Sequence, residues 1–148
     1  MPFTNSNDFI TGRKPVPTSA GLELLAVRFP IDLVAADLDA NDVGSVAILP
    51  AGHQLAGIIY DSDDLDTNAT PTIAASIGPI NAAESDLSAV WASGVQNSRD
   101  GTSSQVVLTP AALRYSAETD TKIGIKFTAA AATKAAGQVG LTLLYRPV

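Results

Sequence analysis

Residues 43–77 decide the fold of this chain, and they read VGSVAILPAGHQLAGIIYDSDDLDTNATPTIAASI. Apolar residues alternate with small ones until Pro50 breaks the run, and a second apolar run covers residues 55–60. A polar, acidic loop at 61–68 separates that run from a third one at 72–77. Short apolar runs separated by Pro, Gly, Asn and Asp are typical of antiparallel strands. The stretch therefore predicts three strands of an all-β domain.

Further strands are expected on both sides of this stretch. The first covers residues 22–29 and ends at Pro30, with Leu25, Val27 and Phe29 on one face. The others are expected at 105–109, 121–128 and 138–147, and residues 110–117 are expected to hold a turn with Leu113 and Tyr115 pointing inward. An Ala-rich loop at 129–137 separates the last two. Seven or eight half-apolar strands bury their faces best in two packed antiparallel sheets, which predicts a β-sandwich or jelly roll.

One helix is predicted, over residues 79–98. Asn81 and Glu84 have the spacing of a capping box. Gly94 suits the end of a helix. Three apolar residues would share one face of the helix: Leu87, Val90 and Trp91. We expect the single tryptophan to anchor this helix to the sheet rather than to stack on a ligand.

The 148 residues indicate one domain, a sandwich over 22–148 preceded by an extended arm at 1–21. Pro15 and Pro17 favour extended backbone in the arm, which we expect not to be a packed element. Two alternatives stay open for it: a disordered tail, or a segment that becomes ordered on a neighbouring subunit. The five arm residues expected to contact a partner are Phe3, Phe9, Ile10, Arg13 and Lys14.

Composition excludes several classes of function. The net charge of -6 argues against binding to nucleic acid or to an anionic membrane. No apolar run approaches the length of a membrane span, and the N-terminus lacks the features of a secretion signal, so we expect folding in a cytoplasm. The absence of cysteine excludes disulfides and thiolate metal sites. Charged residues make up only 16% of the chain against a usual value of about 25%, which suits a surface that lies against another protein.

Two acidic loops are candidate cation sites. The loop at 32–42 carries Asp32, Asp37, Asp39 and Asp42, and the loop at 61–66 carries Asp61, Asp63, Asp64 and Asp66. Neither matches the spacing of an EF-hand. We expect solvated loops, while Ca²⁺ and, for 61–66, a basic patch on a partner stay open as alternatives.

No enzyme activity is predicted, and no catalytic, cofactor-binding or metal-binding residue is assigned. His53 is the only histidine, and it follows the turn at 50–52, where we expect it to face solvent. The sequence contains no Gly-x-Ser-x-Gly elbow, no phosphate-binding glycine loop and no zinc spacing.

The order of several motifs resembles that of decoration, or cement, proteins of tailed-phage heads. The motifs are Leu49-Pro50-Ala51-Gly52 before a strand, DDLDTNAT at 63–70, DTKIGI at 120–125, an Ala/Thr loop ending at Ala136-Gly137, and a last strand ending LYRP at 144–147. The resemblance covers residues 43–148, and the first 40 residues match nothing in that family.

This resemblance implies a structural virion protein on the outer surface of the capsid. It implies the major capsid protein as partner, a homotrimer, and stabilisation of the shell by linking neighbouring subunits. Two alternatives stay open. One is a carbohydrate-binding β-sandwich that uses Tyr60, Trp91 or Tyr115, although all three are expected in the core, and the other is a tail or head-tail connector protein.

Overall fold

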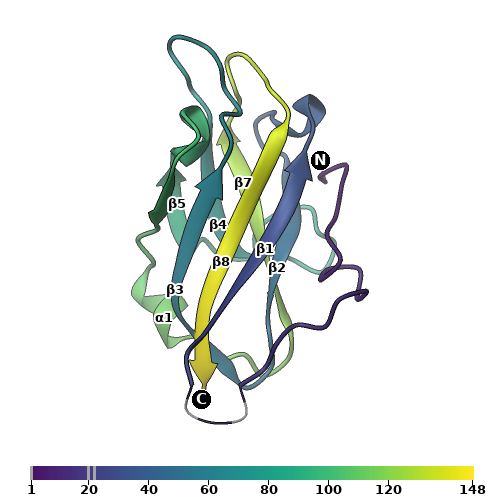
Figure 1. Cartoon of the computed structure of the whole chain (residues 1–148), viewed down its shortest axis with the longest axis vertical. Coiled ribbons are helices and arrows are strands. Elements are labelled where there is room, and N and C mark those ends of the chain that lie inside the picture. Colours follow the sequence, from purple (N-terminus) through teal and green to yellow (C-terminus); the bar gives the residue numbers. More distant parts are fainter. Residues whose placement is uncertain (1, 20, 22) are drawn as a thin grey trace.

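The computed structural model describes residues 2–19, 21 and 23–148. This part of the chain folds into two four-stranded antiparallel sheets packed face to face (Figure 1). The strands are β1 (Leu25–Leu33), β2 (Val43–Leu49), β3 (His53–Ser62), β4 (Ala74–Pro79), β5 (Ala92–Val95), β6 (Ser103–Gln105), β7 (Thr121–Ala129) and β8 (Gly137–Pro147). Their order is β1-β8-β3-β6 in one sheet and β2-β7-β4-β5 in the other, which is the jelly-roll arrangement of eight strands. The predicted all-β sandwich is confirmed.

The core lies between the two sheets and is built from alternate residues of the long strands. In β8 the inward positions are Val139, Leu141, Leu143 and Tyr145, all fully buried. In β7 they are Ile123, Ile125 and Phe127. Alternation places successive side chains on opposite faces, so these two central strands give each sheet its apolar face. Both strands and the loop between them were predicted from the sequence.

The stretch at 43–77 forms β2, β3 and β4, as predicted. The turn between β2 and β3 depends on Gly52, whose φ of 77° lies in the left-handed region that glycine adopts without strain. The N–H of Gly52 donates to the carbonyl of Ala117, and its carbonyl accepts from the N–H of Val148. The turn therefore also holds the C-terminus against the sandwich.

Two strand predictions differ from the structure. Pro30 does not end the first strand, because it pairs with Gly140 inside β1. β1 is an edge strand, where a missing N–H costs no hydrogen bond within the sheet. The strand expected at 105–109 is shorter and earlier: β6 ends at Gln105.

The helix predicted at 79–98 is wrong. Residues 92–95 form β5, which pairs with β4, and the N–H of Trp91 donates to the carbonyl of Ile77. Glu84, the second residue of the expected capping box, has a φ of 53°, which is incompatible with a helix. Pairing with β4 gives this segment hydrogen bonds and burial that a solvent-exposed helix would not supply.

The α-helix of the described chain is instead α1 (Pro110–Arg114), which the Thr109 side chain caps by accepting from the N–H of Ala112. Ala112 faces inward, so the predicted inward orientation of Leu113 and Tyr115 is wrong, and both side chains are exposed. Trp91 is buried as expected, with its ring 5.3 Å from that of Tyr115, but it anchors the start of β5 and not a helix.

Asp66 joins the two sheets at one end of the sandwich. Its carboxylate accepts from the backbone N–H groups of residues 68, 72 and 73 in the β3–β4 loop, and of residues 132 and 133 in the β7–β8 loop. These two loops lie side by side beyond the strands (Figure 1). Each loop connects one sheet to the other, so one carboxylate fixes both crossings.

Burial raises the pKa of Asp66, but the hydrogen bonds from Thr133, Ala132, Thr72 and Ile73 lower it more, to about 2. The expectation of a solvated loop at 61–66 is therefore wrong for Asp66, which is 1% exposed. Backbone N–H donors stabilise its negative charge.

Replacing Asp66 by Asn should lower the free energy of unfolding by about 2–4 kcal/mol, because the amide group would turn a donor toward backbone donors and leave them unpaired. Denaturation by urea measures the change. Asp64→Asn in the same loop, where the side chain is exposed, should cost less than about 1 kcal/mol. Equal stability of the two variants would contradict the role of Asp66.

Acid should remove this contribution over a defined range. The pKa of Asp66 is lowered from 3.8 to about 2 on folding, so its charge stabilises the fold above about pH 4 and the contribution is lost as the pH falls through 2. The shift corresponds to about 2 kcal/mol. The stability difference between the native protein and Asp66→Asn should shrink over this range, and a difference independent of pH would be inconsistent with it.

Candidate functional site

The N-terminal segment 2–19 lies along one side of the sandwich, over the edges of β1 and β2 (Figure 1). The N–H of Phe3 donates to the carbonyl of Val43 in β2. The side-chain amide of Asn7 donates to the carbonyls of Pro30 in β1, at 3.0 Å, and Val46 in β2, at 2.6 Å. The expectation that this segment is not packed is wrong for its described residues, and residues 8–12 form turns instead of extended backbone.

The aromatic side chains of this segment face the chain's own core. Phe9 is buried, with its ring edge-on to that of Phe29 at 4.6 Å between centroids. Phe3 packs against Phe127 at 5.8 Å. A Cβ at Gly44 would lie 2.4 Å from the Phe3 ring, so the glycine makes room for it. Two of the five predicted contact residues are therefore used within the chain.

The other three lie on a compact loop at 7–14. Backbone hydrogen bonds close the loop, including one from the N–H of Lys14 to the carbonyl of Asp8, and the side chain of Asn7 accepts from the N–H of Ile10. Ile10 is half-buried, while Arg13 and Lys14 are exposed. The Lys14 ammonium lies 4.9 Å from the centre of the Phe9 ring, a cation–π distance. The loop therefore presents two cations from a fixed base.

A hollow of about 350 Å³ separates this loop from β1. Its sheet side is lined by Arg28, Asp32 and Gln138, and its loop side by residues that include Asp8 and Lys14. Charges of both signs thus meet between the loop and the sheet.

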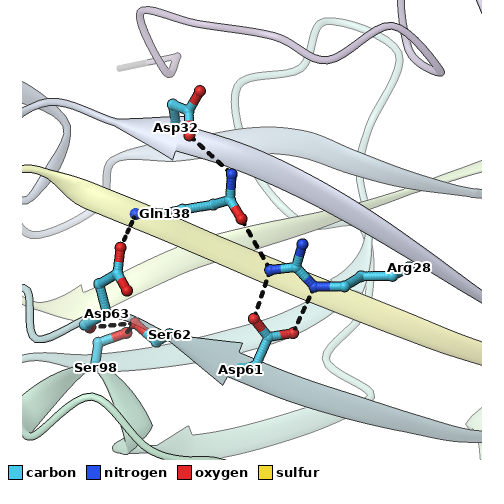
Figure 2. Close-up of polar contacts among 7 residues, drawn as sticks. All are labelled: Arg28, Asp32, Asp61, Ser62, Asp63, Ser98 and Gln138. Atoms are coloured by element: carbon cyan, nitrogen blue, oxygen red, sulfur yellow. Dashed lines mark hydrogen bonds and ion pairs between the residues drawn. The ribbon is translucent and has the colours of Figure 1, made fainter.

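The sheet side of the hollow is held by a polar network that crosses β8 (Figure 2). Arg28 in β1 forms two hydrogen bonds with Asp61 in β3, at 3.1 and 2.6 Å, and a third with Gln138, at 3.0 Å. Gln138 in turn donates to Asp32. A Cβ at Gly140 would lie 2.6 Å from both partners of the ion pair, so this glycine lets the pair pass over β8.

The hydrogen bond to Asp61 raises the pKa of Arg28, but both side chains are partly exposed, so the pair contributes little to stability. Its effect is to fix the positions of charged groups beside the hollow. The third guanidinium nitrogen, Nη1, takes no part in these bonds and points away from Asp61 and Gln138 (Figure 2).

Other carboxylates of the two acidic loops also bind backbone donors. Asp63 accepts from the N–H of Gln138. Asp37 is buried and accepts from the N–H and hydroxyl of Thr4, each at 2.8 Å, and from the N–H of Val34. The solvated loop expected at 32–42 is wrong for Asp37, whose carboxylate secures the N-terminal segment.

A hydroxyl cluster lies beside the network. Ser98 bonds the hydroxyls of Tyr60 and Ser62, each at 2.8 Å, and Figure 2 shows the two serines beside Asp63. Burial raises the pKa of Tyr60 to about 12, and the bonds to Ser98 and Ser62 offset only part of that rise. The cluster ties β3 to the segment that follows β5.

No group of three or more His, Asp or Glu side chains suited to a metal ion is found within 2–19, 21 and 23–148. Over the same residues no helix is long and apolar enough to cross a membrane.

The prediction that His53 faces solvent is wrong. Its side chain is buried, Nε2 accepts from the N–H of Ser19, and Nδ1 lies 3.0 Å from the carbonyl of Ala51, which assigns the proton to Nδ1. The ring packs edge-on against Tyr145, whose hydroxyl donates to the carbonyl of Pro17. These two side chains bind the backbone of Pro17 and Ser19, so His53 helps to position the end of the N-terminal segment.

Comparison with known proteins finds relatives among solved structures alone. No family model matches the chain, and no curated protein matches it. A chain of the capsid of Ralstonia phage GP4 is 26% identical, with a TM-score of 0.81 over 97% of both chains. A chain of the cyanophage Pam1 capsid asymmetric unit is 28% identical, with a TM-score of 0.69 over the full length of both chains.

The chain is a phage-capsid-related protein. The likeness includes the N-terminal segment as well as the sandwich, because it spans both chains of the cyanophage comparison completely. A third match, to the acid-stable capsid structure of Helicobacter pylori bacteriophage KHP30, has a TM-score of 0.52 at 12% identity over 84% of this chain and 91% of that one, and it shows the fold alone.

Phe9→Ala should lower the free energy of unfolding by about 3 kcal/mol, since it removes a buried ring that packs on Phe29. It should also speed cleavage by trypsin after Arg13. Arg13→Ala, at an exposed position of the same loop, should change stability by less than about 0.5 kcal/mol. A Phe9→Ala protein as stable as the native one would show that the segment is not part of the core.

Proposed function

We propose that this chain is a capsid decoration protein that binds the outer surface of an assembled phage head and stabilises it by linking neighbouring subunits of the major capsid protein. The observation that carries the proposal is the full-length likeness to chains of two phage capsids, at 26% and 28% identity. The likeness covers 97% of both chains in the first comparison and the full length of both in the second. The proposed role is structural and not catalytic.

Binding to the assembled lattice but not to free subunits stabilises the lattice by mass action. A protein of this kind needs a rigid body and a surface compatible with protein contact. The described chain has both: a closed jelly-roll core and a surface that is only sparsely charged. As a homotrimer it would gain avidity, because three weak contacts act together.

The loop at 7–14 is the proposed contact with the shell. Arg13, Lys14 and Ile10 are its available side chains, while Phe3 and Phe9 position it from within. Because its base is already fixed on the sandwich, binding would require little further ordering, which favours affinity. Its two cations would pair with carboxylates of the major capsid protein.

The carbohydrate-binding alternative gains nothing from the structure. Tyr60 and Trp91 are buried, which leaves Tyr115 as the exposed member of the three aromatic candidates.

Sedimentation with empty heads that lack this protein tests the proposal. The protein should pellet with the heads at a saturating, fixed ratio to the major capsid protein, and it should raise the temperature at which the heads break. Unassembled major capsid protein is the matched control and should bind much more weakly. Heads that pellet without the protein would refute the decoration role.

Arg13→Glu tests the contact surface separately. We expect it to weaken binding to heads by about tenfold or more, because it places a carboxylate where a cation is needed. The matched control, Arg146→Glu, reverses an exposed charge that hydrogen-bonds Gln54 in β3, and this variant should bind as the native protein does. Equal binding by the native protein and both variants would show that the contact with the shell does not involve Arg13.

A further inference from the structure

The hollow between the 7–14 loop and β1 contains side chains of both charges. Arg28 in β1 and Lys14 in the loop supply the cations, and Asp32 in β1 and Asp8 in the loop supply the carboxylates. Its volume of about 350 Å³ falls in the range of sites that hold small groups. The formal charges of these four side chains cancel. The hydrogen-bonding groups that each side chain leaves open therefore determine what the hollow can bind.

Neighbouring side chains fix the guanidinium group of Arg28. Its Nε and Nη2 atoms donate to Asp61, and Nη2 also donates to Gln138. These bonds leave Nη1, with its two N–H donors, directed away from both partners (Figure 2). Because Gly140 lets the ion pair pass closely over β8, the planar group is held in one orientation. Arg28 thus offers a fixed, open donor on the sheet side of the hollow.

Lys14 provides a second open donor on the loop side of the hollow. Its ammonium lies 4.9 Å from the centre of the Phe9 ring, which is itself packed against Phe29. Within residues 2–19, 21 and 23–148, no hydrogen bond or ion pair of this ammonium to a protein oxygen is found. The contact with the ring holds the cation near the hollow, and its N–H donors remain for an acceptor.

The carboxylates of the hollow favour a peptide over a free anion. Asp32 accepts from the side chain of Gln138 through one oxygen. Its second oxygen and the carboxylate of Asp8 accept from no donor in the part of the chain that the structure describes. These two carboxylates would repel an inorganic anion. An aspartate or glutamate side chain on a peptide also brings backbone N–H groups, which these open acceptors can bind.

We infer that this hollow binds an acidic peptide segment of the major capsid protein, with one carboxylate of the segment accepting from Nη1 of Arg28 and Nζ of Lys14. The inference rests on the proposed function and deepens it, because it names the chemistry of the bound segment and adds Arg28 to the contact surface. Hydrogen bonds from cations to a carboxylate are stronger than neutral ones. Donors that are already fixed lose little conformational freedom on binding, which favours affinity.

Nuclear magnetic resonance on the isotope-labelled, full-length protein tests the binding directly. The probe is the blocked peptide acetyl-Gly-Glu-Gly-amide, which should shift the side-chain resonances of Arg28 and the backbone resonances of the 7–14 loop. Two controls should shift them much less: acetyl-Gly-Gln-Gly-amide, which has the same shape without the charge, and inorganic phosphate, which has charge without peptide N–H groups. Equal shifts from either control, or no shift from the glutamate peptide, would overturn the inference.

Arg28→Gln tests the same site in binding to empty heads. It should weaken binding by about tenfold, and Lys14→Gln should act in the same direction from the loop side. Both variants should keep the native stability in urea, since these side chains are exposed or partly so. Arg146→Gln is the matched control and should bind normally, because Arg146 is exposed on the same face of the sheet but does not line the hollow. Native-like binding by Arg28→Gln and Lys14→Gln would overturn the inference.

Failure of this inference is distinguishable from failure of the proposed function. A native protein that decorates heads, with Arg28→Gln and Lys14→Gln variants that decorate them equally well, would refute the role of the hollow alone. A native protein that binds the glutamate peptide but ignores heads would refute the decoration role. The hollow would then keep its ligand chemistry and lose the major capsid protein as its partner.

Discussion

The buried carboxylate of Asp66 is the interaction on which the closed form of the sandwich depends. Five backbone N–H groups from two loops converge on it, and each loop carries the chain from one sheet to the other. Asp37 likewise accepts hydrogen bonds from the N–H and hydroxyl of Thr4, and Asp63 accepts one from the N–H of Gln138. Carboxylates here replace water as acceptors for loop backbone. An acidic chain can thus hold its carboxylates in structural bonds, which leaves uncharged surface for contact.

The N-terminal segment determines which sides of the molecule remain available. Asn7 bridges the edge strands of both sheets, Phe9 enters the core, and His53 and Tyr145 hold the far end. One side of the jelly roll is therefore closed and carries the exposed cations of the 7–14 loop. The opposite side keeps its strand edges and its exposed valines. The closed side, which carries the cations of the 7–14 loop, is the one proposed to contact the shell.

Sequence patterns predict the strands whose residues alternate between a buried and an exposed face. Strict alternation at 121–128 and 138–147 predicts β7 and β8, because one face of each is buried along its whole length. The helix expected at 79–98 fails because its apolar spacing suits a helix, while pairing with β4, a contact between segments distant in sequence, decides the outcome. Buried Asp66, Asp37 and His53 could not be predicted for the same reason: each has hydrogen-bond partners in a segment distant in sequence, at residues 132 and 133, Thr4 and Ser19 respectively. The link to phage capsids comes from the order of turn motifs and is supported by the structural comparisons. The sequence also indicates Ile10, Arg13 and Lys14 as contact residues, but the packing of Phe3 and Phe9 that fixes the base of their loop required the three-dimensional structure.

A cryo-electron microscopy reconstruction of the phage head that carries this protein tests the central claim most directly. The account predicts jelly-roll density on the outside of the shell, with the 7–14 loop against the major capsid protein. Density inside the shell, or in the tail and not on the head, would contradict it.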